Sequence, residues 1–189
     1  MNSDHLDLTG DPIEGVVSQT VFQNSFVMFQ SHSVADKTFH SIAPASGGGS
    51  VMLAVDSQNR IALVRQERPA VRRHTWEAPR GGREAGEKPI DTAIRELYEE
   101  TGIAADPSSV TSLGRIEADT GLISSELWLF FARVEEGELG SFEDDRGEID
   151  IARWFSAERV VEACLSGEIT DAFTVIAVLK AKALGFLGN

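Results

Sequence analysis

The spacing of apolar residues changes along the chain, and each spacing predicts a strand, a helix or a loop. Residues 16–43 alternate in short runs separated by turn-forming residues, which predicts several short strands. The apolar runs 51–56 and 61–66 flank the polar tetrapeptide SQNR and predict a β-hairpin. Further strands are predicted at 113–119, 127–134 and 152–156.

The clearest helical pattern covers residues 89–101. Pro89 suits the first turn of a helix, and Gly102 suits the position just after its last turn. Two more helices are predicted, one capped by Ser156 and ending near Ser166, the other over 169–185. The apolar positions of the first helix recur at helical spacing: Ile90, Ala93, Ile94 and Leu97.

Glycine and proline mark two further segments. The SGGGS run at 46–50 predicts a flexible break, which divides the chain into a flexible N-terminus with a strand arm (1–48) and a main domain (49–189). The Pro and Gly residues of 68–82 predict an irregular loop. Because strands and helices mix without βαβ regularity, we expect an α+β fold with a mixed sheet.

Composition narrows the class of partner. The 189 residues are 42% hydrophobic, enough for a substantial core, and the formal net charge is −13. This charge disfavours binding to nucleic acid or to an anionic membrane. The single cysteine, Cys164, excludes an internal disulfide and predicts a buried, inert thiol. With no signal-peptide pattern and no membrane-spanning apolar run, a cytoplasmic protein is expected.

The helix at 89–101 concentrates acidic residues where like charges repel. Glu96 and Glu100 lie one turn apart on a helix, with Glu99 beside both. Hard oxygen ligands on a rigid element suit Mg²⁺ or Mn²⁺, whose charge would offset this repulsion and let a diphosphate approach. Arg95 is spaced to orient one of these carboxylates. The alternative is an ordinary solvated acidic face.

The spacing around these carboxylates favours the metal site. The pattern is Gly, five residues, Glu, seven residues, Arg-Glu-apolar, one residue, Glu-Glu, one residue and Gly-apolar, which is the Nudix box. On that pattern this chain resembles the Nudix hydrolase superfamily. The matching residues are Gly81, Glu87, Arg95, Glu96, Leu97, Glu99, Glu100, Gly102 and Ile103.

The resemblance implies a loop-helix-loop on an α/β/α sandwich that uses Mg²⁺, or Mn²⁺, to hydrolyse a nucleoside diphosphate linked to another group. It implies that Glu99 and Glu100 act in catalysis and that the box glycines, Glu87 and Arg95 are structural. The implied metal ligands are Glu96, Glu99, Glu100 and the backbone carbonyl of Arg80; the implied structural residues are Gly81, Glu87, Arg95 and Gly102.

A second resemblance concerns the substrate. VRQERP and WEAPRGG are similar to the Q-x-R…E-x-P-x-G segment of ADP-ribose pyrophosphatases, which implies substrate-binding roles for Arg68, Glu77 and Glu126 and a homodimer formed through the N-terminal arm. A surface arginine and a solvated strand-start glutamate are the alternatives for Arg68 and Glu126. Thr120-Gly121 stands where these enzymes usually have Pro-Gly, so GDP-mannose or another nucleotide sugar is the alternative to ADP-ribose.

A group that positions or deprotonates water is also needed. The resemblance places it in the acidic segment FEDDRGEID, with Glu148 first and Glu143, Asp144 and Asp145 as alternatives, or a solvated turn with no such role. Two other functions share the box, namely a non-catalytic ligand sensor and a hydrolase of oxidised nucleoside triphosphates. The intact box disfavours the first, and the N-terminal strand arm disfavours the second.

Overall fold

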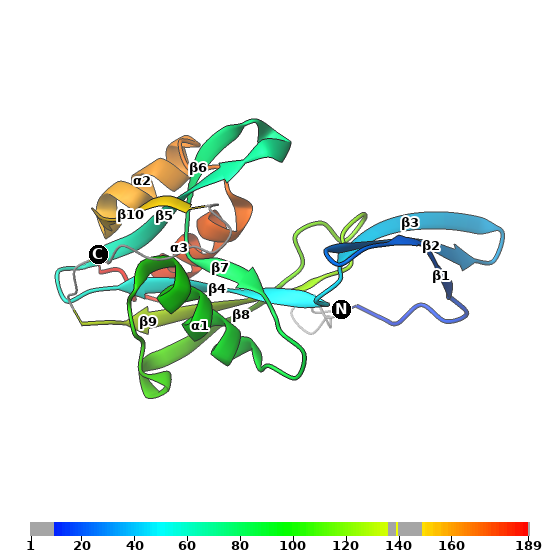
Figure 1. The fold of residues 1–189 in the computed structure, drawn as a ribbon, viewed down its shortest axis with the longest axis horizontal. Helices are drawn as coiled ribbons and strands as arrows, with labels where there is room; N and C mark the ends of the chain where they lie inside the picture. Colours follow the sequence, from blue (N-terminus) through cyan, green and yellow to red (C-terminus); the bar gives the residue numbers. More distant parts are fainter. Residues whose placement is uncertain (1–9, 136–138, 140–148, 189) are drawn as a thin grey trace, which may run out of the picture.

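The computed structural model describes residues 10–135, 139 and 149–188. Two sheets lie along the long axis of the molecule, a small one built from the N-terminal strands and a larger one in the main body (Figure 1). The strands are β1 (Val17–Gln23), β2 (Val27–Val34), β3 (Lys37–Pro44), β4 (Gly48–Val55), β5 (Arg60–Arg68), β6 (Arg73–Glu77), β7 (Arg80–Gly82), β8 (Val110–Ile116), β9 (Glu126–Arg133) and β10 (Ile149–Ser156).

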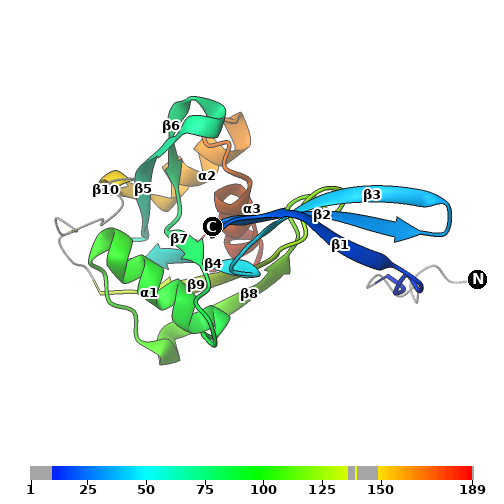
Figure 2. The ribbon, with the colours of Figure 1, turned by 45° about the vertical axis from the view of Figure 1, so that its right-hand side comes forward.

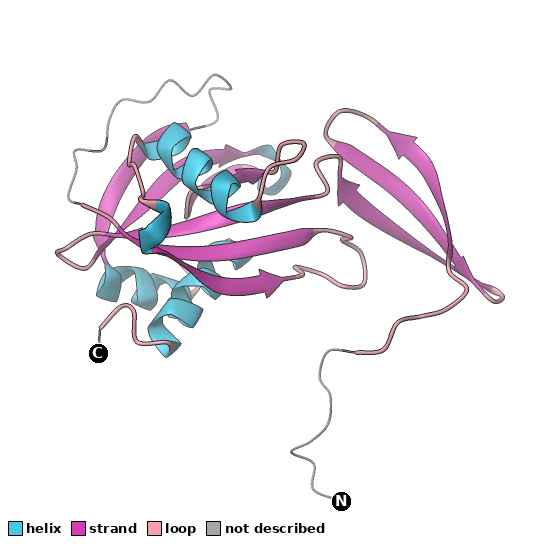
Figure 3. Cartoon of the chain, turned by 90° about the horizontal axis from the view of Figure 1, so that it is seen from below, coloured by secondary structure: helices cyan, strands magenta, loops and turns pink. Residues whose placement is uncertain are grey.

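The described residues form three α-helices, which cover the larger sheet on both faces and make the body an α/β/α sandwich (Figure 3). The sheet order is β10-β5-β4-β9-β8, with β4 and β9 parallel and the other neighbours antiparallel. The mixed sheet and the α+β class are therefore confirmed. The helices are α1 (Pro89–Thr101), α2 (Ala157–Ser166) and α3 (Ala172–Ala183), with short 3-10 turns η2 (Pro69–Val71) and η3 (Pro107–Ser109).

The central strand β4 builds two cores by alternation. Val51 and Leu53 point to the face that α2 and α3 cover, whereas Met52 and Ala54 point to the face that α1 covers. All four side chains are fully buried. Because successive residues of a strand face opposite sides, one apolar run anchors helices on both faces of the sheet. In the described part of the chain, no helix is long and apolar enough to cross a membrane.

The expectation of an irregular loop over residues 68–82 is wrong. The segment 68–82 contains β6, which pairs with β5, and β7, which pairs with β4. The predicted hairpin of β4 and β5 pairs only at Val55↔Ile61. The two strands then diverge. The backbone N–H and C=O groups that this leaves unpaired on β5 and β4 bond instead to β6 and β7, respectively.

The second half of the glycine run belongs to strand β4, whereas Ser46 and Gly47 lie in the exposed turn before it. Gly48 and Gly49 begin β4 and are buried, and a Cβ on either would overlap a carbonyl oxygen, that of Glu126 or of Gly81. Glycine is required there because neighbouring backbones approach closely. These contacts join the start of β4 to the loop that precedes α1.

The predicted N-terminal strands are confirmed as an antiparallel arm of β1, β2 and β3. This arm projects from one end of the body (Figures 1 and 2). It contacts the segment between β8 and β9, where the Ile42 N–H donates to the carbonyl oxygen of Leu122 at 2.8 Å and the Ser124 N–H donates to that of Ile42 at 2.9 Å. The division at residue 48 stays a prediction.

Candidate active site

Helix α1 forms as its pattern predicts. Ala93 and Leu97 are fully buried, and Ile90 and Ile94 pack beside them on the core under the sheet. Gly102 ends the helix in the left-handed conformation, with φ of 73° and its N–H bonded to the carbonyl of Tyr98. The buried stripe fixes the helix rigidly, so the carboxylates on its other side occupy defined positions.

Arg95 and Glu87 tie the loop to this helix. Arg95 Nε donates to Glu87 Oε1 at 3.0 Å, and Arg95 Nη1 donates to Glu96 Oε1 at 2.7 Å and to Glu99 Oε2 at 2.9 Å. Glu87 also accepts hydrogen bonds from the Glu84 N–H and the Thr92 hydroxyl. The Arg95 hydrogen bond is the main reason that the pKa of Glu87 lies at about 2. These contacts connect the loop before α1 to the carboxylates of the helix.

Gly81 of β7 lies directly against the carboxylate of Glu96. A Cβ at residue 81 would overlap all three carboxylate atoms of that side chain. The strand places this residue beside Ser50 of the buried strand β4, so the backbone has little room to move away. The requirement for glycine in the box is therefore steric: it leaves space for a carboxylate.

Glu100 is a buried acid with few compensating contacts. It accepts hydrogen bonds from Gln66 Nε2 at 2.9 Å and from the backbone N–H of Arg80 at 3.1 Å, and it is 8% exposed. Burial, followed by the negative charge of Glu96, raises its pKa to about 8. Two neighbouring carboxylates therefore lie where added positive charge would be favourable.

The donor set fits a hard divalent cation. Glu96, Glu99 and Glu100 offer carboxylate oxygens at one end of α1, beside the loop that carries Arg80. Among the described residues no three His, Cys, Asp or Glu side chains already converge as ligands, and the guanidinium of Arg95 contacts both Glu96 and Glu99. Glu99 is 53% exposed and so has room to change rotamer. The residues match the oxygen chemistry that Mg²⁺ prefers.

A second charged group consists of Glu77 and the two arginines that bond to it, Arg68 and Arg80. Glu77 is 2% exposed, and its carboxylate accepts hydrogen bonds from Arg68 Nε at 2.9 Å, Arg68 Nη2 at 2.7 Å and Arg80 Nη2 at 2.8 Å. Burial opposes its ionisation, but the hydrogen bonds and charges of the two arginines outweigh this and lower its pKa to about 2. The structure thus brings together Arg68, Glu77 and Arg80.

This pairing predicts a pH dependence of stability. Glu77 has its pKa lowered from 4.5 to about 2 in the folded state, so its contribution is complete above pH 4.5 and is lost as the pH falls through 2. That contribution is about 3 kcal/mol. We expect Glu77→Gln to lose it at pH 7 and to flatten the acid limb of a urea-unfolding series. Glu67→Gln, an exposed position on the neighbouring strand β5, is the control, and equal acid limbs would contradict the prediction.

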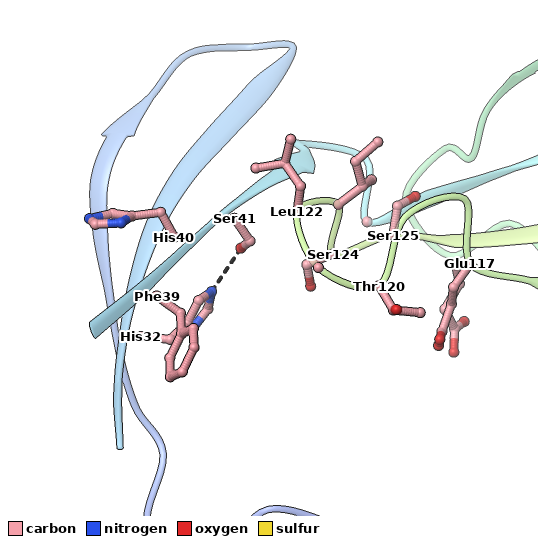
Figure 4. Close-up of a pocket in the computed structure, with 13 residues that line it drawn as sticks. His32, Phe39, His40, Ser41, Glu117, Thr120, Leu122, Ser124 and Ser125 are labelled. Carbon is pink, nitrogen blue, oxygen red and sulfur yellow. Dashed lines mark hydrogen bonds between the residues drawn. The ribbon is translucent and has the colours of Figure 1, made fainter. Parts of the chain in front are cut away.

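A cleft of about 630 Å³ opens between the arm and the segment joining β8 to β9 (Figure 4). Glu126 lies in its wall and pairs with Arg115 at 2.7 Å, and Thr120 lies in the same wall. Gly47, the residue before β4, also lines the cleft, which therefore lies two residues from Gly49, the glycine that contacts Gly81. Other lining residues include His32, Phe39, Ser41 and Glu117.

Some predicted residues cannot be placed, and some unpredicted ones emerge. Glu148, Glu143, Asp144 and Asp145 lie outside the described residues. Gln66 was present in the Q-x-R pattern but was not assigned a role. Asp171, Phe173 and Thr174 precede or begin α3 and contact Arg80 of β7 or Ala78, the residue after β6. A polar cap ahead of an apolar helix was their only sequence signal.

Comparison with known proteins places the chain in a family. The NUDIX domain matches residues 48–173. The chain is 33% identical over 134 residues to an ADP-ribose pyrophosphatase of Bacillus subtilis, covering 69% of this chain and 70% of that protein. It is 31% identical over 140 residues to an ADP-ribose pyrophosphatase of Mycobacterium tuberculosis, covering 72% and 66%.

The match to another relative is shorter. An RNA pyrophosphohydrolase of Azorhizobium caulinodans is 35% identical over 98 residues, which is 48% of this chain and 56% of that protein. The chain therefore spans little more than half the length of that relative. The domain match covers the carboxylate helix, the Gly81 loop and the strands that hold them. On this evidence the chain belongs to the Nudix family.

Proposed function

We propose that the protein is a divalent-metal-dependent pyrophosphohydrolase that cleaves the diphosphate of a nucleotide sugar. One observation carries this proposal: Glu96, one of the carboxylates of α1, lies against Gly81 of β7, beside the group formed by buried Glu77 and the half-buried Arg68 and Arg80. Negative ligands for a cation and arginines that suit phosphate are thus adjacent. This combination is what binding and hydrolysis of a diphosphate require.

The acidic residues and Arg95 would have different roles in this reaction. Glu96, Glu99, Glu100 and the Arg80 carbonyl would hold the metal, which would offset charge on the diphosphate and lower the pKa of the attacking water. Arg95 and Glu87 hold the carboxylates and the loop in place. The products would be two phosphomonoesters, because water adds to one phosphorus while the bridging oxygen leaves with the other. The acidic segment with Glu148 would position that water.

ADP-ribose is the substrate we favour, with AMP and ribose 5-phosphate as products. The similarity to two ADP-ribose pyrophosphatases supports it. The lining of the cleft supports a nucleoside or sugar there, since it offers hydroxyls, an aromatic ring and carboxylates, and its described residues include no lysine or arginine for phosphate. The net charge of −13 disfavours a long RNA. GDP-mannose is the alternative, because Thr120 shapes the cleft wall.

The substrate is tested by initial rates on a panel of ADP-ribose, GDP-mannose, UDP-glucose, NADH and dGTP with Mg²⁺. We expect ADP-ribose to give the highest kcat/KM. A higher value for GDP-mannose would keep the chemistry and change the substrate. Metal-dependent cleavage of dGTP alone would assign the protein to triphosphate hydrolysis, and cleavage of none would favour a ligand sensor.

We also propose that the arm binds a second copy of the chain. Every residue of β1 is exposed, and Val17, Val21 and Phe22 are 70%, 58% and 56% exposed. Phe26, in the turn to β2, is 73% exposed. Apolar patches of this kind on an edge strand usually mark an interface. A twofold pairing of arms would cover them and place two clefts near the same interface.

Sedimentation velocity tests this dimer. We expect Val21→Asp combined with Phe22→Asp to weaken dimerisation at least tenfold, since each lost apolar contact is worth about 1.5–3 kcal/mol. Leu165→Asp, an equally exposed apolar position on α2, should sediment like the wild type. A wild-type protein that is monomeric at every concentration would contradict the proposal.

A further inference from the structure

Arg80 has a side chain that is held on three sides. Its Nε and Nη2 donate to Glu77 Oε2 at 3.0 Å and 2.8 Å, and Nη2 also reaches Asp171 Oδ1 at 3.3 Å. The guanidinium lies 4.7 Å from the centre of the Phe173 ring, a cation–π contact. Two carboxylates and a ring therefore fix the plane of this guanidinium.

One edge of the same guanidinium is open. Arg80 is 22% exposed, and its Nη1 donates to no residue in the described part of the chain. An arginine has five N–H donors, so the two on Nη1 are available for a ligand. A guanidinium that is fixed in orientation and retains two donors is suited to bind a phosphoryl group.

Arg80, which carries this open edge, lies between the carboxylates of α1 and the Glu77 carboxylate. The backbone N–H of Arg80 holds Glu100, and the next residue, Gly81, contacts Glu96. Arg80 also shares the Glu77 carboxylate with Arg68, whose Nη2 donates to the same Oε2 atom at 2.7 Å. A diphosphate bound beside the carboxylates would therefore lie within the field of these arginines.

We propose that the side chain of Arg80 binds a phosphate oxygen of the substrate through Nη1, and that Asp171 and Phe173 position it. This inference rests on the proposed function and adds a phosphate-binding residue to it. The role predicted from the sequence used only the backbone carbonyl of Arg80. The competing explanation is that the side chain serves only to fasten β7 to the start of α3.

Equilibrium binding separates these explanations. The probe is α,β-methylene-ADP with Mg²⁺, whose bridging carbon prevents hydrolysis, measured by calorimetry. We expect Arg80→Ala to weaken binding about 10- to 100-fold, the effect of losing a charged hydrogen bond. Arg80→Lys should recover only part of this, because lysine cannot reproduce the fork geometry. Mn²⁺ binding without nucleotide should change less than about threefold, since any residue supplies a carbonyl.

Positioning is tested at Phe173. Phe173→Leu removes the ring under the guanidinium and should weaken analogue binding about 3- to 10-fold, whereas Phe173→Tyr should restore it. Arg159→Ala, which breaks a surface ion pair on α2, is the matched arginine control. It should bind the analogue like the wild type.

The outcomes distinguish this inference from the function on which it rests. If the wild type cleaves nucleotide sugars and a folded Arg80→Ala binds the analogue equally well, the phosphate role is wrong and the function stands. If Arg80→Ala fails to fold, a Phe173→Leu protein with wild-type affinity would overturn the positioning role, and a folded Arg80→Lys with wild-type affinity would overturn the fork contact. If the wild type neither binds nor cleaves, the proposed function fails.

Discussion

Replacing Glu100 by glutamine should lower kcat by about a thousandfold or more and yet make the metal-free protein more stable at pH 9. The loss follows because a metal ligand supplies several kcal/mol of stabilisation to the transition state. The gain in stability follows because the glutamine carries no charge at this buried position, which is 8% exposed. An amide can still accept from the Arg80 N–H and donate to a flipped Gln66.

The direction of the stability change comes from the raised pKa. Glu100 titrates near pH 8 in the folded state and near 4.5 when unfolded, so between these values the folded protein binds more protons. The free energy of unfolding therefore falls as the pH rises through this window. The penalty is complete above pH 8 and is on the order of 2–5 kcal/mol.

Urea unfolding in EDTA and steady-state kinetics with Mg²⁺ measure the two effects. Glu158→Gln, on the exposed side of α2, is the control and should change neither. A Glu100→Gln protein that keeps more than a tenth of the activity would exclude Glu100 as a ligand. One that is less stable than the wild type at pH 9 would show that its charge is already compensated.

The second large effect concerns a residue without a side chain. Gly81→Ala should reduce kcat/KM about a hundredfold, because the added Cβ overlaps the Glu96 carboxylate and displaces it. Displacement of a catalytic group by about 1 Å is enough for such a loss. No charge is removed by this substitution, so the effect is one of position alone.

Gly82→Ala is the matched control, since its Cβ would meet only the Ser46 side chain, at 3.3 Å from Oγ. We expect it to stay within about threefold of the wild type. Mn²⁺ titration should show weaker binding in Gly81→Ala and little change in Gly82→Ala. Equal activity of the two variants would contradict the packing of Glu96 against β7.

The sequence predicts the parts whose signals are local. The apolar stripe of α1 and the capping residue Gly102 lie within one short segment, so their pattern alone places the carboxylates on one side of the helix. The strands β6 and β7 were missed because proline and glycine in 68–82 suggested irregular structure. They form because β4 and β5 diverge and their edges need partners, which is a tertiary cause.

Contacts between side chains from distant segments could also not be predicted from the sequence. Asp171 is ninety-one positions from Arg80 in the sequence, and nothing in a helix-capping pattern indicates that it contacts β7. Likewise, the glycines at 48 and 49 resembled a linker in the sequence. Glycine is needed there because the backbone of residues 81 and 126, which are distant along the chain, approaches closely. A motif can fix which carboxylates matter, but the fold decides which arginines stand beside them.

The most direct test of the diphosphate-hydrolase proposal is phosphorus NMR of ADP-ribose incubated with the protein and Mg²⁺ in water enriched in ¹⁸O. We expect two phosphomonoesters, AMP and ribose 5-phosphate, one of which carries a single ¹⁸O from the water, and no reaction in EDTA. Unchanged ADP-ribose alongside unchanged nucleotide sugars, or products that form equally well in EDTA, would contradict a metal-dependent attack of water on the diphosphate.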